Sequence, residues 1–159
     1  MEPSTPTLPE TSSSRKIYLI ILILALIGVA NAAYLSIPAY EYWFWADKLA
    51  LQMMPCDLSD TLSCSGILQN PRSLIFGIPF PMIALVVYPI LSVIALMGWL
   101  RRRTLEAKIL TGLSAGGICF NSYVIYQESI VGVFCPLCAM CSVIIVTIFV
   151  LSIMIWKQK

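Results

Sequence analysis

The sequence predicts an all-α integral membrane protein, a bundle of four transmembrane helices with a long extracytoplasmic loop between the first two. Three observations support this fold class. Of the 159 residues, 59% are hydrophobic and only 11% are charged, well below the quarter that is usual in soluble domains. The mean hydropathy is +0.88. Four apolar stretches are also long enough to cross a bilayer.

The first of these stretches follows a polar N-terminal segment. Residues 1–16 are rich in Pro, Ser and Thr and end in Arg15 and Lys16, so we expect a disordered cytoplasmic tail. Residues 17–37 carry no charge and predict the first spanning helix. A cleaved signal peptide would have a shorter apolar core, and we therefore expect this helix to be retained.

The second span is predicted over residues 74–100 and contains several prolines. Spanning helices tolerate proline where neighbouring groups satisfy the carbonyls that it leaves free. Pro79, Pro81 and Pro89 therefore indicate kinks rather than an end of the span.

The third and fourth spans are predicted over residues 109–126 and 131–156. Gly112 and Gly116 lie four residues apart in the third span, a spacing typical of helices whose backbones approach closely. A short cytoplasmic tail, residues 157–159, would follow the fourth span. The four spans would form one domain over residues 17–156.

Lysine and arginine residues set the orientation of these spans. The first connection, residues 38–73, has only Lys48 and Arg72, and the third connection has neither type. The other flanks are basic, with Arg15, Lys16, Arg101, Arg102, Arg103, Lys108, Lys157 and Lys159. The positive-inside rule therefore predicts both termini in the cytoplasm and the first and third connections outside.

Four of the six cysteines fall on the extracytoplasmic side in this topology. Cys56 and Cys64 lie in the first connection, and Cys135 and Cys138 open the fourth span. Disulfides persist in oxidising compartments. The charge pattern and the cysteine positions are independent signals, and they agree.

The stretch Cys135-Pro136-Leu137-Cys138 predicts a redox-active pair at a helix N-terminus. Proline suits the first helical position, and the helix dipole favours the thiolate of a cysteine beside it. A static disulfide and two buried thiols are the structural alternatives. The second outward-facing pair, Cys56 and Cys64, favours redox chemistry over both.

Metal binding is a further alternative, because Cys141 extends the motif to a second C-x-x-C. Iron–sulfur and zinc sites usually take a fourth ligand from a folded loop, whereas these cysteines share one apolar helix. We therefore expect no metal, and we expect Cys119 and Cys141 to be small packing residues. The chain has no histidine, which excludes Cys-His dyads and His-ligated metals or haem.

Other features of the first connection receive simpler interpretations. The aromatic run at residues 40–48 predicts an interfacial belt; the alternative is that it shields a pocket or docks a partner. Asp57 and Asp60 are expected to be solvated loop charges rather than catalytic acids. The net charge of +2 is too small to indicate nucleic acid binding.

Three stretches together resemble the vitamin K epoxide reductase family in its bacterial form. They read CDLSDTLSC at residues 56–64, CSGILQNPRSLIFGIPFP at residues 64–81 and CPLC at residues 135–138. The resemblance extends over about residues 17–156. It implies a four-helix bundle around a quinone, either ubiquinone or a menaquinone of the vitamin K type.

The resemblance also implies a path for electrons from a thioredoxin-like, DsbA-like extracytoplasmic partner to the quinone. Cys56 would exchange with the partner, and Cys64 would attack the disulfide between Cys135 and Cys138, at Cys135. Cys138 would lie next to the quinone. Spacing does not determine the resting disulfide, which stays open between Cys135–Cys138 and Cys64–Cys135.

The quinone contacts implied by the resemblance are Cys138, Asn70, Ser73 and Phe76. Asn70 stands where the family commonly has a small hydroxyl residue, and its amide can still donate a hydrogen bond to a quinone carbonyl. Ser73 lies nearby in the sequence, and Phe76 belongs to the Phe-Gly turn before the second span.

The expected function is therefore a membrane thiol–quinone oxidoreductase that reoxidises its partner and drives disulfide formation in exported proteins. We expect it in the bacterial inner membrane, with a separate thioredoxin-like partner because the sequence contains no fused thioredoxin domain. Vitamin K quinone or epoxide reduction as the main role is one alternative. Another alternative is a non-catalytic membrane protein that is stabilised by static disulfides. A DsbB-type enzyme would have the two cysteine pairs in the reverse order.

Overall fold

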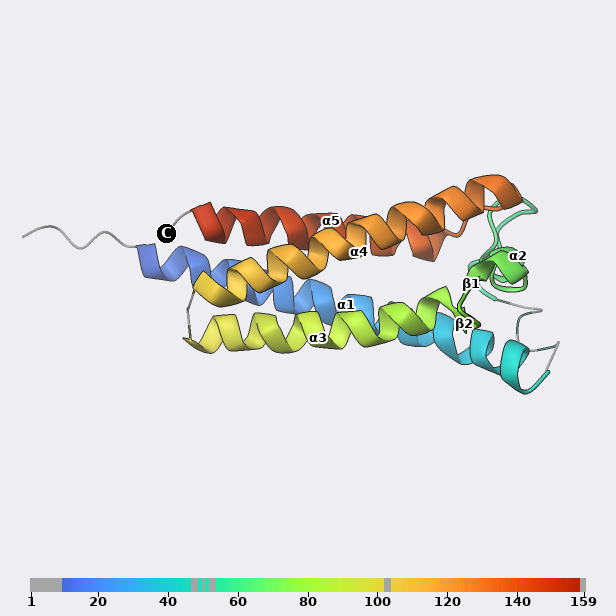
Figure 1. The fold of residues 1–159 in the computed structure, drawn as a ribbon, viewed down its shortest axis with the longest axis horizontal. Helices are drawn as coiled ribbons and strands as arrows, with labels where there is room; N and C mark the ends of the chain where they lie inside the picture. Colours follow the sequence, from blue (N-terminus) through green and yellow to red (C-terminus); the bar gives the residue numbers. More distant parts are fainter. Residues whose placement is uncertain (1–9, 47–48, 50, 52–53, 102–103, 158–159) are drawn as a thin grey trace, which may run out of the picture.

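A computed structural model describes residues 10–46, 49, 51, 54–101 and 104–157. Four long helices make up most of it (Figure 1), namely α1 (Glu10–Phe44), α3 (Phe80–Arg101), α4 (Thr104–Val131) and α5 (Pro136–Lys157). The short elements between α1 and α3 are α2 (Cys64–Leu68), the 3-10 helix η1 (Pro71–Ser73), β1 (Leu74–Ile75) and β2 (Ile78–Pro79).

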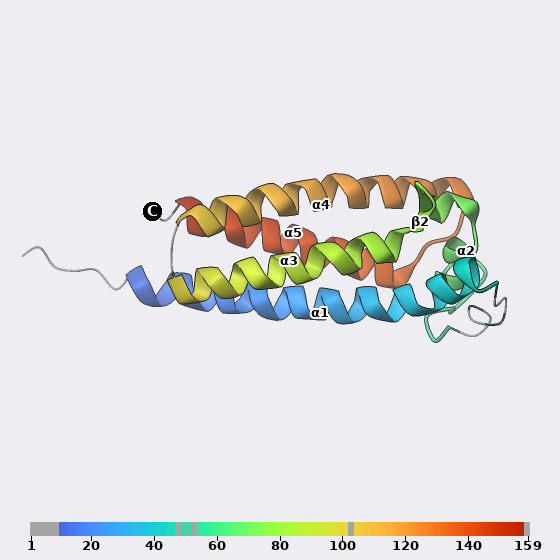
Figure 2. The same ribbon diagram turned by 60° about the horizontal axis from the view of Figure 1, so that its bottom comes forward.

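The four long helices run alternately up and down the bundle (Figure 2). Helix α1 packs against α3 and α5, and α4 packs against α5 and α3. Helix α1 begins at the end of the bundle where α5 finishes, and α2 with the two strands lies at the opposite end (Figure 1). We call these the terminus end and the loop end.

All four long helices have the length and apolar composition of membrane spans. The most apolar windows have mean hydropathies of 2.4 in α1, 2.4 in α3, 1.3 in α4 and 2.8 in α5. Large apolar side chains also cover the outside of the bundle, among them Ile23, Val93 and Val143. An apolar outer surface suits lipid rather than water. The all-α membrane bundle expected from the sequence is confirmed.

The first helix is longer than the expected span of residues 17–37. It begins at Glu10, within the segment expected to be a tail, and continues to Phe44. Its 35 residues reach roughly 50 Å at 1.5 Å per residue, so the helix extends beyond a hydrocarbon core of about 30 Å. Residues 1–9 and 158–159 of the expected tails lie outside the described residues.

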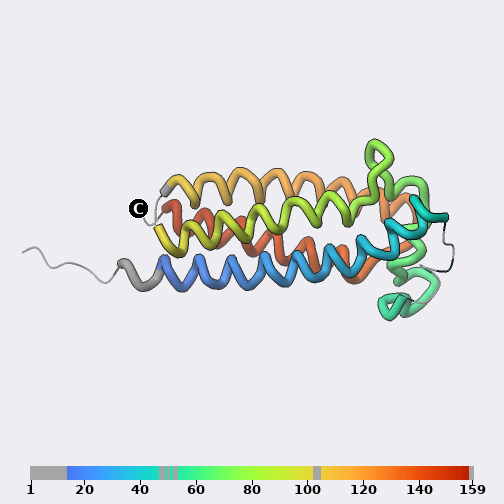
Figure 3. The backbone as a smooth tube through the Cα atoms, turned by 90° about the horizontal axis from the view of Figure 1, so that it is seen from below, coloured from blue at the N-terminus to red at the C-terminus, as the bar shows by residue number. Residues whose placement is uncertain are grey.

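The second span is shorter than expected, because residues 74–79 form a hairpin instead of helix. Leu74 pairs with Pro79 and Ile75 with Ile78. Phe76 and Gly77 have φ values of 52° and 82°, which matches a two-residue turn of the type that follows strand twist. Figure 3 shows the hairpin projecting from the loop end.

The prolines of this region occupy three different settings. Pro79 closes the hairpin, and Pro81 lies in the first turn of α3, where its missing N–H has no helical partner to lose. Pro89 alone lies inside the helix. The expectation of kinks at all three positions is therefore wrong for Pro79 and Pro81.

Close helix packing occurs at other glycines than expected. A methyl group added at Gly112 or Gly116 would meet nothing within 4 Å, whereas one at Gly117 would lie 2.9 Å from Ile145 on α5. A methyl group at Gly98 would overlap the ring of Tyr18. The predicted close approach at Gly112 and Gly116 is therefore wrong, and both positions border open space.

The contact at Gly98 can be tested by substitution. We expect Gly98→Ala to lower the free energy of unfolding in detergent by about 1–3 kcal/mol, because the buried Tyr18 ring must move. Gly112→Ala is the matched control. It meets no atom and should be neutral or stabilising by up to about 1 kcal/mol, as alanine favours helix. Thermal melts of the purified variants measure both effects, and equal melts would contradict this packing.

Candidate active site

The loop before α2 is joined to the start of α5 by backbone hydrogen bonds. The Phe134 N–H donates to the Thr61 carbonyl at 2.8 Å, and the Ser63 N–H donates to the Phe134 carbonyl at 3.1 Å. These bonds form a parallel bridge between Leu62 and Phe134. Since Cys64 and Cys135 follow directly on the two sides, the bridge brings these distant cysteines together.

The chain reaches this bridge from α4 through a glycine cap. Helix α4 ends at Val131, and Gly132 has a φ of 75°, the left-handed conformation that commonly terminates helices. Its N–H donates to the Glu128 carbonyl at 2.9 Å. Cys135 then precedes Pro136, the first residue of α5. The predicted placement of the C-x-x-C pair at a helix start is confirmed.

The start of α2 is fixed by Ser63 and Asp57. The Ser63 hydroxyl accepts the Gly66 N–H at 3.0 Å. One Asp57 oxygen accepts the Ser63 hydroxyl at 2.7 Å and the Ser65 N–H at 3.0 Å. Asp57 is therefore a structural cap beside Cys64 rather than the expected solvated charge. Partial burial raises the Asp57 pKa, but the hydrogen bonds from Ser65 and Ser63 outweigh it and hold the pKa below its usual value.

The four predicted cysteines form a connected group. Cys56 and Cys64 are joined by a disulfide, and the Cys135 Sγ lies 3.4 Å from the Cys64 Sγ. The Cys138 N–H donates to the Cys135 Sγ at 3.3 Å. Cys135 and Cys138 are free thiols, so the structure contains neither of the two resting disulfides that spacing left open. Cys64 and Cys135 are fully buried, while Cys56 is partly exposed.

The environment of Cys135 favours its thiolate. A hydrogen bond from the Cys138 thiol is the main cause that lowers the Cys135 pKa, and the backbone N–H groups of Cys138 and Leu137 act in the same direction. Burial and the nearby Glu128 carboxylate oppose them without reversing the shift. A lowered pKa makes Cys135 a better leaving group in thiol–disulfide exchange.

One residue of this group was missed from the sequence. The Glu128 side chain is 1% exposed, and its Oε2 accepts the Cys135 N–H at 3.4 Å. A carboxylate oxygen of Glu128 and the sulfurs of Cys135 and Cys138 lie within 4.8 Å of one another. The sequence contained only part of a signal. Glu128 is the only charged residue between Lys108 and Lys157, but the predicted third span ended at residue 126, whereas α4 continues to Val131 and makes Glu128 an ionisable residue of a spanning helix, a type that is usually functional.

These three side chains also have the donor types of a metal site. Three donors leave a tetrahedral zinc ion one ligand short, and the Cys135 sulfur is already in contact with Cys64. We therefore assign no metal to the group. Cys141, the third cysteine of the alternative cluster, instead accepts a hydrogen bond from the Asn31 amide at 3.0 Å.

The predicted quinone contacts other than Cys138 lie elsewhere. The Asn70 Oδ1 accepts the Arg72 N–H and caps η1. The buried Ser73 hydroxyl donates to the Leu68 carbonyl at 3.1 Å, and Phe76 is fully exposed at the hairpin turn. None of these three lines the cavity that reaches Cys138. Their contact with quinone stays a prediction.

A small apolar cavity of about 40 Å³ does lie beside Cys138, lined by residues of α1, α2, α3, α4 and α5. Its walls include Phe120, Asn121 and Cys141. The same three residues line a larger cavity of about 310 Å³ between α3, α4 and α5. Gly116 borders this second cavity, which explains the open space beside that glycine. The two cavities share a wall and lead from mid-bundle toward Cys138.

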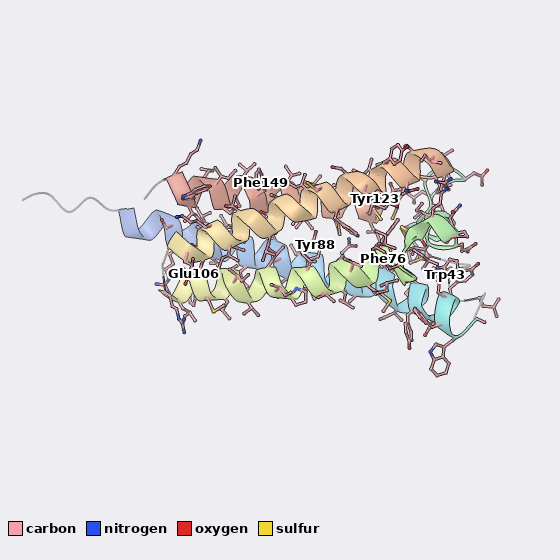
Figure 4. All side chains as sticks on the ribbon, viewed as in Figure 1. Trp43, Phe76, Tyr88, Glu106, Tyr123 and Phe149 are labelled. Carbon is pink, nitrogen blue, oxygen red and sulfur yellow. A yellow bond between two sulfur atoms is a disulfide. The ribbon has the colours of Figure 1, made fainter. Side chains whose placement is uncertain are left out.

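The other residues singled out in the sequence are Cys119, Cys141 and the aromatic run. Cys119 is exposed on the outside of α4, so its expected packing role is wrong, whereas Cys141 packs against the core as expected. Trp43, from the aromatic run, donates its Nε1–H to the Leu68 carbonyl at 2.9 Å. Figure 4 places Trp43 at the loop end. Residues 47 and 48 of this run lie outside the described residues.

Comparisons with known proteins agree with the geometry. A family model described as "Vitamin K epoxide reductase family" matches residues 19–153. No curated protein matches the chain.

The Asp57 cap gives a prediction about the loop. We expect Asp57→Ala to weaken the start of α2 by about 1 kcal/mol, which would speed hydrogen exchange at the Ser65 and Gly66 amides about fivefold. Asp60→Ala, a substitution in the exposed part of the same loop, should leave that exchange unchanged. Hydrogen exchange followed by mass spectrometry measures both.

The same cap should respond to pH. The pKa of Asp57 is lower in the folded protein than in the unfolded chain. Its contribution to stability is therefore fully present at pH values above the unfolded-state pKa of about 3.9. That contribution is lost as the pH falls through the folded-state pKa. Protection of the Ser65 amide against hydrogen exchange should therefore fall in acid in the native protein but not in Asp57→Ala. Protection that does not change with pH would contradict the role of the carboxylate.

Proposed function

The chain belongs to the vitamin K epoxide reductase family, whose members are membrane oxidoreductases of thiols and quinones, and we propose that it passes electrons from an extracytoplasmic thioredoxin-like protein to a quinone. In doing so it reoxidises a DsbA-like partner and drives disulfide formation in exported proteins. One observation carries the proposal: the loop cysteine Cys64 and the helix cysteine Cys135 lie with their sulfurs 3.4 Å apart.

The exposure of the four cysteines supports the order of transfer. Cys56 is the partly exposed member of the loop pair and is the sulfur that a partner protein can reach. Cys64 is buried between Cys56, to which it is bonded, and Cys135. Cys138 follows on α5 and lines the apolar cavity. Electrons entering at Cys56 would therefore move inward toward the cavity.

Each transfer is a thiol–disulfide exchange in which the sulfur electron pairs balance. The partner's thiols reduce the Cys56–Cys64 disulfide, and the partner leaves with a disulfide of its own. The Cys64 thiolate then attacks Cys135 in an oxidised Cys135–Cys138 pair. The Cys56 thiolate next attacks Cys64 and releases Cys135. The products are the Cys56–Cys64 disulfide, which we call the loop disulfide, and the free thiols of Cys135 and Cys138, which we call the inner pair. The structure contains this pairing.

The larger cavity, of about 310 Å³, has the size and chemistry to hold a quinone ring, and the smaller one, of about 40 Å³, shares walls with it and reaches Cys138. A quinone supplies a two-electron, two-proton acceptor and is carried in the bilayer. The cavity walls are mostly apolar, as quinone sites require, and the Asn121 amide is a polar group within them. This amide donates to the Ser142 hydroxyl at 2.6 Å and has a second N–H. Tyr88, at mid-bundle in Figure 4, also lines the larger cavity.

The charges of the terminus end support a cytoplasmic location for it. The Arg15 guanidinium lies 4.6 Å from the centre of the Trp99 ring, and the Lys108 ammonium lies 6.0 Å from that of Trp156. Lysine, arginine and tryptophan at one end of a bundle suit a cytoplasmic headgroup layer. We therefore place both termini in the cytoplasm of a bacterium and the loop end outside its inner membrane.

The test is quinone absorbance in detergent. A reduced thioredoxin-like donor is mixed with the protein and either ubiquinone or a menaquinone analogue. We expect Cys138→Ala to abolish quinone reduction, because the cavity cysteine is lost. Cys56→Ala should block the protein donor yet spare reduction by a small dithiol. Cys119→Ala, on the outside of α4, is the control and should stay active.

Two outcomes would contradict this relay. Equal loss of both activities in Cys56→Ala would remove Cys56 from the partner-facing position. A folded protein that reduces neither quinone would instead favour a structural role, with the loop disulfide as a static staple. Retention of that disulfide under mild dithiol treatment would support the structural role.

The cavity makes a second prediction about the same activity. Gly116→Leu should fill space beside α4 without a clash, since no atom lies within 4 Å of an added Cβ. We expect the KM for quinone to rise about tenfold, as a loss of about 1.4 kcal/mol in binding, with little change in exchange between the cysteine pairs. Val143→Leu, which places a leucine on the outside of α5 away from the cavity, is the control. An unchanged KM would place the quinone elsewhere.

A further inference from the structure

Glu128 is buried where a carboxyl group is costly. It is the only charged residue between Lys108 and Lys157, and its side chain is 1% exposed. A buried ionisable group requires a hydrogen-bonded or charged partner. Among the described residues only one of its oxygens, Oε2, has such a partner, the Cys135 N–H at 3.4 Å.

The carboxyl group is directed at the inner cysteine pair. One carboxylate oxygen and the sulfurs of Cys135 and Cys138 lie within 4.8 Å of one another. The other oxygen, Oε1, is buried without a hydrogen-bond partner among the described residues. Glu128 therefore lies next to the sulfur atoms that would exchange electrons, and its Oε1 can still accept a hydrogen bond.

The opposite side of Glu128 borders a surface cleft. This cleft has a volume of about 300 Å³, is open at the loop end, and is lined by Thr61, Leu62, Gly132 and Phe134 as well as by Glu128. The cleft brings solvent next to Glu128, although Oε1 of its carboxyl group is itself buried. Glu128 thus lies between solvent and two sulfurs that are otherwise buried at the loop end.

The exchange proposed above needs a proton donor at this point. Sulfur leaves a disulfide as a thiolate, and a thiolate is unstable in an apolar cavity until it is protonated. Histidine is the usual group for such transfers, and this chain has none. We propose that Glu128 is a catalytic proton-transfer residue, which gives its proton to the Cys138 sulfur as the Cys135–Cys138 bond breaks and regains one from water in the cleft.

The step balances in atoms and electrons, and it rests on the proposed relay. The Cys64 thiolate forms a bond to Cys135, and the electron pair of the breaking bond goes to the Cys138 sulfur, which takes the Glu128 proton. The Cys56 thiolate then bonds to Cys64, and Cys135 leaves as a thiolate. The protons of Cys56 and Cys64 go to solvent, and one proton returns through the cleft.

Few other groups can titrate around Glu128. From the start of α5 it faces the thiols of Cys135 and Cys138. The Cys64 sulfur from α2 is held in a disulfide in this structure, and when that disulfide opens its thiol is present equally in the native protein and in Glu128→Gln. From η1, the Arg72 guanidinium donates to Gln127, the neighbour of Glu128, at 3.2 Å. A pH dependence that disappears with the Glu128 carboxyl group can therefore be assigned to it.

The test measures exchange without quinone. Protein with an oxidised inner pair is mixed with dithiothreitol, quenched in acid and alkylated, and mass spectrometry follows the appearance of the Cys138 thiol. Glu128→Gln keeps the shape and an acceptor for the Cys135 N–H but cannot donate a carboxyl proton. We expect it to react about a hundredfold more slowly. The decline in rate as the pH rises through the Glu128 pKa should also be lost.

The matched control is the other buried carboxyl group of α4. Glu106 is 8% exposed and lies at the terminus end, at the opposite end of the bundle from Trp43 (Figure 4). Glu106→Gln should keep the native rate and pH profile. Glu128→Ala, with sodium formate added, supplies a second variant, because the cleft can admit a small carboxylic acid. Formate should raise its exchange rate in proportion to concentration.

Two results would overturn the proposal. One is a native rate and pH profile in Glu128→Gln. The other is a slow, folded Glu128→Ala that formate does not accelerate, which would leave Glu128 a structural role only. Failure of the quinone relay is distinguishable from both. In that case the native protein would not reduce quinone through Cys138, while exchange with dithiothreitol would still be measured.

Discussion

The two backbone hydrogen bonds between residues 61–63 and Phe134 are the constraint on which the redox site depends. They join two segments that lie far apart in the sequence and determine which cysteines meet. Without them, Cys64 would belong to a long exterior loop and Cys135 to the start of a separate helix. Both bonds join main-chain groups, so they require no side-chain donor or acceptor of their own.

The surrounding contacts hold this bridge in place. Asp57 and Ser63 fix the start of α2 on one side, and Gly132 turns the chain out of α4 on the other. Apolar side chains, among them Leu35, Ile67 and Leu68, then cover Cys64 and Cys135. Excluding water strengthens the electrostatic interactions inside such a cluster. The sulfurs therefore react in a dry, preorganised setting whose polar contacts are few and specific.

The sequence predicted the overall plan of the protein but not the local geometry of its site. Charge-free runs and flanking cations are strong signals, so the four spans and their alternation were predictable. Phe76 shows the limit: the Phe-Gly pair indicated a turn, but nothing indicated a hairpin with a positive φ at Phe76 itself, so the predicted second span begins at residue 74 and α3 begins at Phe80. Asn70 and Ser73 were predicted from the resemblance to a family position shortly after the second loop cysteine. The cavity is instead lined by Asn121, which only tertiary packing brings near Cys138.

Closing the ring between Cys56 and Cys64 has a consequence for the direction of electron flow. The two cysteines are eight residues apart, and the Asp57 cap and the bridge hold the segment between them near its closed shape. Two thiols released from such a ring stay at a high effective concentration relative to each other. In the proposed relay, a loop opened by a partner would therefore close again readily once an oxidised Cys135–Cys138 pair is present to accept the electron pair. A short ring of this kind would favour transfer of the electron pair from the loop toward Cys135 in that relay.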